Sequence, residues 1–190
     1  TGTIGHIGTT SFFPSKNLGC YGDGGAMFTN DDNLAEKMKM IANHGQSKRY
    51  YHKVTGCNSR LDSIQAAILN VKLKYLDHYN SNREKMAKTY DIGFGDVEHL
   101  SIPFRSPNST HVFHQYTLKT SYEYRDKLIK YLTKKEIPAM IYYPVPLYKQ
   151  EAFSSYVPEN FSIENIEKLC NSVFSPVSYT HLRAHETNSN

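Results

Sequence analysis

Apolar residues at helical spacing mark the longest predicted element of the chain. Alternating steps of three and four residues separate the apolar positions Leu61, Ile64, Ile68, Val71 and Tyr75. This spacing predicts a helix that begins near Asp62 and buries one stripe over about four turns. The pattern continues to Tyr90, which predicts either one long helix or a pair broken within residues 80–82. Gly93 and Gly95 end the helical region.

A strand, a helix and a polar loop are predicted before this long element. Residues 26–29 form a short strand. Asn30 and the two aspartates after it supply N-cap oxygens and early negative charge for a helix that ends at Gly45. The apolar face of that helix carries Leu34, Met38, Ile41 and Ala42. Residues 46–60 show little periodicity and are rich in aromatic and cationic groups, so we expect a loop there.

Shorter elements follow after residue 110. Residues 112–118 alternate as in a strand, and residues 122–135 bury Leu128, Ile129 and Leu132 at helical spacing. Residues 138–143 read as another strand, which closes a β-α-β unit of a small α/β domain, and a further helix is predicted over residues 163–173.

The main domain boundary is predicted in the proline- and serine-bearing connection 96–110. Residues 1–95 then form one domain with the long helix at its end, and residues 96–176 form the small α/β domain.

Composition indicates a globular protein. Of the 190 residues, 39% are hydrophobic, 13% aromatic and 21% charged, which excludes a disordered chain. The net charge of +4 comes from mixed signs, so no basic stripe for nucleic acid or anionic lipid is present, although an anionic small molecule is compatible. No apolar run approaches the roughly 20 residues of a membrane span, and no signal peptide is visible. Three unpatterned cysteines indicate free thiols in a reducing cytoplasm.

Both ends of the chain carry unusual sequence. The chain opens at Thr1 without an initiator methionine, and its glycine-rich start reads as a domain interior, so we expect an upstream part. Residues 177–190 resemble the translation of a sequencing adapter and are predicted to be non-native. His181 and His185 have the spacing of a helical metal pair, but the glutamate of the His-Glu-x-x-His motif is absent, and we predict no metal site.

One lysine, Lys16, stands in an unusually rigid setting. Two aromatics, a proline and a serine precede it, and four glycines within residues 19–25 allow the backbone to turn back directly after it. A lysine that forms a Schiff base must be aimed and partly desolvated, which suits such flanks. The alternative is a solvated surface charge, as most lysines are.

Four segments in fixed order resemble the DegT/DnrJ/StrS family of pyridoxal-phosphate-dependent nucleotide-sugar aminotransferases. They are SFFPSKNLGCYGDGGA (11–26), NHGQ (43–46), NSRLDSIQAA (58–67) and YYPVPL (142–147). The resemblance extends from residue 1 to about 175. It implies the α/β aspartate aminotransferase fold (fold type I), with the end of the large cofactor domain followed by the small domain.

The resemblance implies a role for three residues near the cofactor. Lys16 matches the lysine that binds pyridoxal phosphate and shuttles a proton, since a primary amine alone forms and releases an imine. Ser11 matches a hydroxyl that binds the cofactor phosphate; its alternative is a turn-capping serine. Asn58 matches an asparagine that reaches the cofactor phosphate of the neighbouring subunit in a homodimer, with a helix cap as the alternative.

Three further residues match substrate positions. Arg60 matches a residue near the anionic nucleotide-sugar, against the alternative of a solvated charge. Tyr142 and Tyr143 match the substrate-facing end of a small-domain strand, where the family often has histidine in place of Tyr142. His44 and Gln46 fall in a family motif without an assigned chemistry, so a structural role is expected.

The implied activity is transfer of an amino group, with glutamate as donor, to a keto group of a nucleotide-linked sugar. The sequence of residues 11–25 looks most like the corresponding segment of enzymes that act on UDP-linked 3-keto, N-acetylated uronic acids. Such enzymes serve the assembly of a surface polysaccharide or glycan. Alternatives are a 4-keto-sugar aminotransferase and a non-catalytic sensory or structural relative. The family's dehydratase branch carries histidine in place of the lysine, which Lys16 argues against.

One part of the implied site is expected upstream of Thr1. It includes the aspartate that pairs with the pyridine nitrogen and the main phosphate loop. We therefore expect the 190-residue chain alone to have little or no activity.

Overall fold

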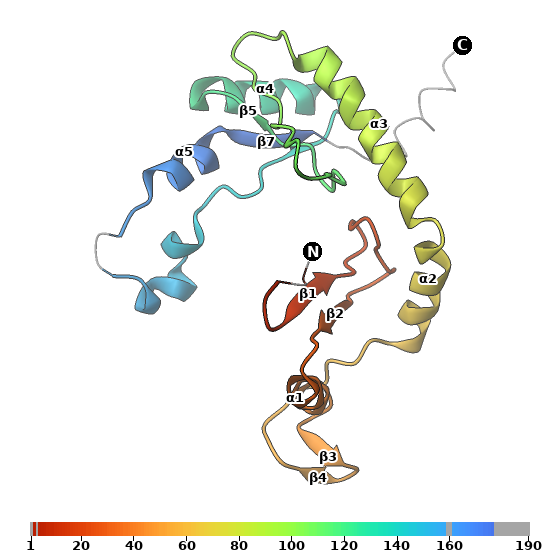
Figure 1. The fold of residues 1–190 in the computed structure, drawn as a ribbon. Helices are drawn as coiled ribbons and strands as arrows, with labels where there is room; N and C mark the ends of the chain where they lie inside the picture. Colours follow the sequence, from red (N-terminus) through yellow and green to blue (C-terminus); the bar gives the residue numbers. More distant parts are fainter. Residues whose placement is uncertain (1, 3, 159–160, 177–190) are drawn as a thin grey trace. The chain divides into compact units, whose positions relative to one another are not determined.

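The protein folds into two compact units, each built from helices and short strands (Figure 1). A computed structural model describes residues 2, 4–158 and 161–176. The units are Thr1–Tyr79 and Asn80–Asn190. They divide within a helix, before the boundary expected at residues 95 and 96. The stretch 177–190, with His181 and His185, lies outside the described residues. The mixture of helices and strands agrees with the predicted α/β class.

An antiparallel strand pair opens the first unit. Strands β1 (Gly8–Ser11) and β2 (Gly25–Phe28) pair in a register that sets Ser11 opposite Gly25. The predicted strand 26–29 corresponds to β2, displaced by one residue. The connection between β1 and β2 contains Lys16, so the strand pair fixes both ends of the lysine segment.

Helix α1 (Asp32–Ala42) begins as predicted, because Asp31 caps it. The Asp31 Oδ1 atom accepts hydrogen bonds from the amides of Asn33 at 2.8 Å and Leu34 at 3.1 Å. After the helix, Gly45 has φ +74°, and a Cβ there would lie 1.7 Å from the Val54 carbonyl oxygen. Only glycine fits this position, which explains why the helix pattern stops there.

Residues 46–60 contain a small hairpin where a loop was expected. Strands β3 (Gln46–Lys48) and β4 (Tyr51–His52) pair antiparallel with a shift in register, and Tyr50 between them has φ +69°. Strands this short, paired with a bulge, leave no alternation in the sequence, so the expectation of an irregular loop was wrong.

The long helical region is a pair of helices, as one of the two alternatives predicted. Helices α2 (Ser63–Leu73) and α3 (Leu76–Phe94) are separated at residues 74 and 75. The break predicted within residues 80–82 was wrong, because asparagine weakens a helix only slightly and α3 runs through these positions.

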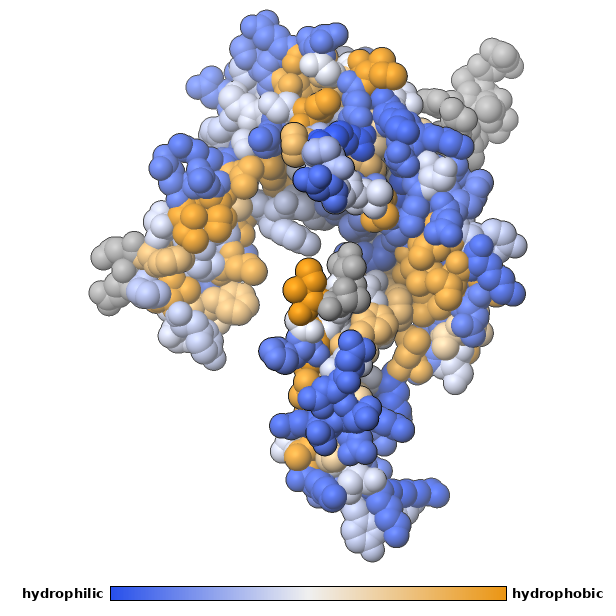
Figure 2. Space-filling model, in the orientation of Figure 1, coloured by the Kyte–Doolittle hydropathy of each residue, from blue (hydrophilic) through white to orange (hydrophobic). Residues whose placement is uncertain are grey.

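The stripe predicted to be buried on α2 is mostly exposed. Ile64 is 73% exposed and Val71 is 59% exposed, whereas the buried residue of α2 is Leu69. Figure 2 shows the resulting apolar surface over α2. The helix turns a neighbouring face, with Gln65, Leu69 and Lys72, toward the lysine segment, and apolar periodicity alone does not reveal that choice.

The second unit is built around a three-stranded sheet. Its strands are β5 (Leu118–Lys119), β6 (Ala139–Met140) and β7 (Val173–Pro176), in the order β5-β7-β6, with β7 antiparallel to both neighbours. Strands β5 and β6 are therefore parallel to each other. Helix α4 (Tyr122–Lys134) connects them, so the predicted β-α-β unit is present with β7 inserted between its strands.

The remaining elements of the second unit follow β6. The short helices η1 (Leu147–Lys149) and η2 (Glu151–Tyr156) lead to α5 (Glu164–Ser172), close to the helix predicted over 163–173. The strand predicted over 112–118 is confined to β5. Phe113 has φ +44°, and Arg83 donates hydrogen bonds to the carbonyls of Phe113 and His114, both at 3.2 Å, in place of a neighbouring strand.

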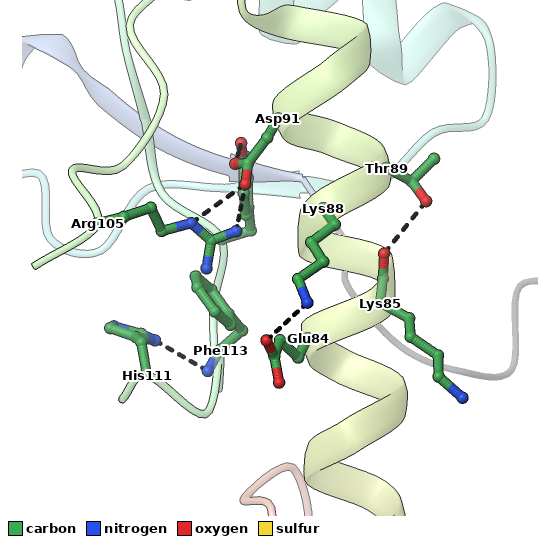
Figure 3. A network of polar contacts seen from close by, with 9 residues as sticks. Glu84, Lys85, Lys88, Thr89, Asp91, Arg105, His111 and Phe113 are labelled. Carbon is green, nitrogen blue, oxygen red and sulfur yellow. Dashed lines mark hydrogen bonds and ion pairs between the residues drawn. The ribbon is translucent and has the colours of Figure 1, made fainter. Parts of the chain in front are cut away.

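The core of the second unit is aromatic and borders a half-buried polar cluster. Ala87, Phe113, Tyr116, Leu118 and Phe174 are buried together. The Tyr116 hydroxyl donates to Asp91 Oδ1 at 2.7 Å, and Arg105 Nε donates to Asp91 Oδ2 at 3.1 Å; Figure 3 shows Asp91 on α3 facing Arg105. Burial, together with the Asp91 hydrogen bond, raises the pKa of the Tyr116 phenol. This cluster attaches the C-terminal half of α3 to the second unit.

Within the part of the chain that the structure describes, no helix combines the length and apolar character needed to cross a lipid bilayer.

Candidate active site

Backbone hydrogen bonds close the lysine segment into a compact loop over residues 12–24. The Phe12 amide donates to the Gly24 carbonyl at 2.8 Å, and the Cys20 amide donates to the Phe12 carbonyl at 2.8 Å. Within this lysine loop, the Lys16 amide donates to the Phe13 carbonyl at 2.8 Å, which forms a turn. Lys16 is half-buried. The backbone that carries its amine is thus fixed on both sides.

Close packing at Gly19 and Cys20 explains the composition of this loop. A Cβ on Gly19 would lie 2.5 Å from the Pro14 carbonyl oxygen, so a side chain does not fit there. The buried Cys20 thiol lies 3.0 Å from the carbonyl oxygens of both Phe12 and Gly22. Glycine and a small buried thiol allow the chain to fold tightly back after Lys16.

Two polar residues of α2 brace the lysine loop. The Gln65 Oε1 atom accepts a hydrogen bond from the Tyr21 amide at 2.8 Å. The Lys72 ammonium donates to the Gly19 carbonyl and lies 5.4 Å from the centre of the Tyr21 ring. Sequence reasoning missed these roles. The available signal was a glutamine and a lysine seven residues apart within an apolar helix, which places both on one face.

Ser11 takes part in a local turn and remains able to donate a hydrogen bond. The Phe13 amide donates to Ser11 Oγ at 3.2 Å, the contact that the turn-capping alternative requires. A hydroxyl that accepts one hydrogen bond still has its proton to donate. Ser11 is exposed at the end of β1, so both roles are compatible.

Asn58 lies beside the end of α1 and does not cap α2. It forms an isolated antiparallel bridge with Asn43, and the N-cap position of α2 is occupied by Asp62. The helix-cap alternative for Asn58 was therefore wrong. Asn58 is exposed, and its side chain is accessible to another molecule.

Arg60 is held at the junction of two cavities in the first unit. Its Nη1 atom donates to Asn43 Oδ1 at 2.7 Å. Arg60 lines a groove of about 410 Å³ together with Thr10, Gly24 and Gly25, beside the lysine loop. It also lines a cavity of about 730 Å³ formed by α1 and the β3–β4 hairpin.

Four of the six predicted site residues belong to the first unit. Lys16 and Ser11 come from the β1–β2 connection, and Asn58 and Arg60 come from the segment that precedes α2. Tyr142 and Tyr143 belong to the second unit, directly after β6. Tyr142 is half-buried and Tyr143 is 72% exposed, with their rings edge to face at 5.6 Å.

His44 and Gln46 have structural roles, in line with the default expectation. The His44 amide donates to the Cys57 carbonyl at 2.9 Å, and the His44 carbonyl lies 2.8 Å from His52 Nδ1. Gln46 pairs with His52 in the hairpin. These contacts attach the hairpin to the end of α1.

An unpredicted carboxylate network follows the tyrosine pair in the second unit. Glu167 Oε1 accepts hydrogen bonds from Tyr148 and Ser162, both at 2.8 Å, and pairs with Lys149 at 2.8 Å. The hydrogen bond from Lys149, with those from Tyr148 and Ser162, lowers the pKa of Glu167 to about 2. The network fastens η1 to α5.

Almost the whole chain matches one family of known proteins. The model of the DegT/DnrJ/EryC1/StrS aminotransferase family matches residues 1–189. The chain belongs to this family. The predicted family is thereby confirmed, and Lys16 lies in the segment that carried the resemblance.

Two relatives illustrate the range of proteins that the chain resembles. It is 42% identical over 186 residues to a pleiotropic regulatory protein of Geobacillus stearothermophilus, covering 96% of this chain and 49% of the relative. It is 46% identical over 146 residues to the UDP-2-acetamido-2-deoxy-3-oxo-D-glucuronate aminotransferase of Pseudomonas aeruginosa, covering 77% of this chain and 40% of the relative. The chain spans less than half the length of these two relatives.

Solved structures support the fold. DesV of S. venezuelae, crystallised with a ketimine intermediate, matches with a TM-score of 0.83 at 37% identity, over 93% of this chain and 47% of that one. NtdA of Bacillus subtilis, solved with bound PMP, matches with a TM-score of 0.81 at 26% identity, over 93% and 42%. The predicted aminotransferase fold is confirmed, and the DegT/DnrJ/EryC1/StrS assignment indicates pyridoxal phosphate as the cofactor.

The residues of the first unit fit this cofactor. A half-buried primary amine on a braced loop suits its aldehyde, and an exposed hydroxyl that still has a proton to donate suits its phosphate. Glycines line the adjacent groove, so the backbone allows close approach of a flat ring.

Proposed function

We propose that the protein is a pyridoxal-phosphate-dependent aminotransferase that acts on a keto group of a nucleotide-linked sugar. The observation that carries this proposal is the half-buried Lys16 on a loop that α2 braces at Gly19 and Tyr21. A surface lysine has no need of such support, whereas an amine that binds an aldehyde and then moves a proton must be aimed.

The chemistry transfers an amino group between two carbon skeletons. The donor amino acid loses its amino group and becomes a 2-keto acid by taking an oxygen from water, while the keto sugar gains the amino group and its oxygen leaves as water. Pyridoxal phosphate, when bound, supplies the electron sink that makes the carbon next to the nitrogen acidic. The Lys16 amine holds the cofactor between turnovers and moves the proton as general base and acid.

The other residues bind and orient. Ser11 donates to the cofactor phosphate, and Asn58 reaches the cofactor phosphate of the neighbouring subunit in a homodimer. Arg60 attracts the anionic part of the substrate. Tyr142 and Tyr143 contact the sugar. The family resemblance implies histidine in place of Tyr142 in many members, so this pair bears on which sugar is accepted.

The substrate we propose is a UDP-linked 3-keto sugar with glutamate as the donor, in the assembly of a surface polysaccharide or glycan. The 46% identity to an aminotransferase named for UDP-2-acetamido-2-deoxy-3-oxo-D-glucuronate supports the 3-keto position. A 4-keto sugar is the runner-up.

A regulatory function is the second candidate, since one relative is named a pleiotropic regulatory protein. Lys16 favours the enzyme, because a regulator that retains only the fold has no need of the amine.

Trapping of the cofactor tests the proposed function. The full-length protein is loaded with pyridoxal phosphate, reduced with borohydride and digested, and the peptides are weighed by mass spectrometry. The cofactor should add to Lys16 alone, and a Lys16→Ala variant should lose both the adduct and transamination. A Lys37→Ala variant, which alters an exposed lysine of α1, is the matched control. An unlabelled Lys16, or an active Lys16→Ala variant, would overturn the proposal.

A further inference from the structure

A small groove in the second unit is lined mainly by hydroxyl groups. It has a volume of about 310 Å³ and lies where β5 leads into α4, beside the end of α5. Its polar lining residues are Ser101, Thr120, Ser121, Ser172, Lys119 and His99. Four of these six carry a hydroxyl, and no acidic side chain is among the described residues that line it. We call this site the hydroxyl groove.

Thr120 is the buried hydroxyl residue of the groove. It is 9% exposed, and its hydroxyl forms no hydrogen bond with the residues that the structure describes. The Thr120 amide donates to the Ser172 carbonyl at 2.9 Å, which fixes the backbone at this position. Because Thr120 lines the groove, the part of it that remains exposed faces that space. A buried polar group is normally hydrogen-bonded, so this hydroxyl indicates a ligand that would complete it.

The N-terminus of α4 adds further donors to the groove. Ser121 occupies the N-cap position, but its side chain makes no capping hydrogen bond. The Ser121 carbonyl accepts from the amides of Tyr124 at 3.1 Å and Arg125 at 3.0 Å. The earlier amides, of Tyr122 and Glu123, have no acceptor within a helix, and the helix dipole favours negative charge beside them. The Glu123 side chain is exposed and does not line the groove.

Lys119 supplies a positive charge at the same place. It is exposed on β5, and its backbone exchanges hydrogen bonds of 2.8 and 3.0 Å with Ser101. The ion pairs of residues 2, 4–158 and 161–176 do not include Lys119, whereas His99 lies 3.4 Å from Glu98. The plainer explanation, a solvated polar surface, accounts for the exposed Lys119 but not for the buried hydroxyl of Thr120.

We propose that the hydroxyl groove binds a phosphate group, either as inorganic phosphate or as the phosphomonoester of a small molecule. Its donors come from residue 101, residues 119–121 and residue 172, and a tetrahedral oxyanion has enough oxygens to accept from several of them at once. Ser11, proposed above to bind the cofactor phosphate, belongs to the other unit. This second phosphate site therefore goes beyond the proposed function and does not depend on it.

Protection of the Lys119 amine from acetylation tests the site. The full-length protein, loaded with pyridoxal phosphate, is treated with limiting sulfo-N-hydroxysuccinimide acetate at increasing concentrations of inorganic phosphate. Mass spectrometry of peptides then reports each lysine separately. Acetylation of Lys119 should fall at least about threefold near saturation, because a bound oxyanion pairs with the ammonium. Lys127 and Lys130, exposed on α4 outside the groove, should be unaffected.

Two further titrations separate the sources of the effect. Chloride at equal ionic strength should not protect Lys119, because it reproduces only the screening of charge. Glycerol 3-phosphate distinguishes the free ion from an ester. Protection at a lower concentration than with inorganic phosphate would identify a phosphomonoester as the better ligand, and the reverse order would identify the free ion.

Variants assign the protection to Thr120. A Thr120→Val variant keeps the shape of the side chain and loses the hydroxyl, so the phosphate concentration for half protection should rise about tenfold or more. A Thr120→Ser variant should retain protection. Thr110→Val, which removes an exposed hydroxyl of the same unit outside the groove, is the matched control. Circular dichroism confirms that each variant is folded.

Three results would overturn the hydroxyl groove. They are equal acetylation of Lys119 with and without phosphate, protection that chloride reproduces, and unchanged protection in the folded Thr120→Val variant. Cofactor trapping on Lys16 involves none of these residues, so the phosphate site and the proposed function can each fail without the other.

Discussion

The side-chain oxygen of Gln65 lies 2.8 Å from the backbone nitrogen of Tyr21 and accepts its hydrogen bond. This contact joins α2 to the lysine loop across 44 positions of the sequence. Together with the bond from Lys72 to the Gly19 carbonyl, it makes the position of Lys16 depend on a helix that does not contain it.

Loss of this brace should weaken cofactor binding. A Gln65→Leu, Lys72→Met variant keeps the bulk of both side chains but removes two hydrogen bonds. At about 1 kcal/mol for each, the dissociation constant for pyridoxal phosphate should rise roughly fivefold or more. Absorbance titration of the full-length apoprotein measures it. Asn70→Ala, an exposed change on the same helix, should leave the constant unchanged. Equal constants for the brace variant and the wild type would show that the loop is rigid without α2.

Gly19 should tolerate no side chain. In a Gly19→Ala variant the new Cβ would meet the Pro14 carbonyl oxygen at 2.5 Å, and the backbone must shift at a cost of about 1–3 kcal/mol. Gly93→Ala is the control, because a Cβ there meets nothing within 4 Å in a helix and should stabilise by about 0.5–1 kcal/mol. Urea denaturation of both variants measures the free energies of unfolding. A Gly19→Ala protein as stable as the wild type would contradict the tight turn.

The Glu167 network should make stability depend on pH in the acid range. The pKa of Glu167 is about 2 in the folded protein against an ordinary value of 4.5, so its contribution is fully present above about pH 4.5 and is lost as the pH falls toward 2. A Glu167→Gln variant should be less stable than the wild type at pH 7, and the difference should shrink below pH 4.5. Thermal melts across this range test it, with Glu164→Gln, from an exposed pair, as the control. A difference that does not vary with pH would rule out the carboxylate as its source.

A shared active site should allow complementation between subunits. If Asn58 serves the neighbouring subunit, a mixture of inactive Lys16→Ala and inactive Asn58→Ala subunits forms heterodimers with one intact site each. Random exchange should restore about one quarter of the wild-type activity. Activity is measured after exchange has been verified by mass spectrometry. No recovery in proven heterodimers would place Asn58 in the site of its own subunit.

Local chemistry made part of this structure predictable from sequence. The Asp31 cap, α4 and the glycine-rich return after Lys16 follow from residues close together in the chain. The strand expected over 112–118 failed because Arg83, thirty residues away, satisfies the carbonyl of Phe113. Alternation in sequence does not report such a distant donor.

The residues of the candidate site also fall into those predictable from local sequence and those that depend on distant contacts. Lys16 and Ser11 were predicted from one short motif, whereas Gln65 and Lys72 were missed because their partners are backbone groups of a remote loop. Every residue carries the same backbone carbonyl group, so the sequence does not indicate which carbonyl a lysine side chain will bind. The larger cavity of the first unit was missed for a related reason, since α1, the hairpin and Arg60 are separate in the chain.

The strand order β5-β7-β6 also determines when the sheet of the second unit can form during synthesis. The central strand, Val173–Pro176, is the last of the three to leave the ribosome, and β5 and β6 have no hydrogen bonds to each other without it. The sheet therefore forms only after β7 has been synthesised, because Leu118 pairs with Phe174 and Ala139 pairs with Pro176. A nascent chain that ends before residue 173 should be cut readily by protease throughout its second unit, while the lysine loop, already closed onto α2, stays protected.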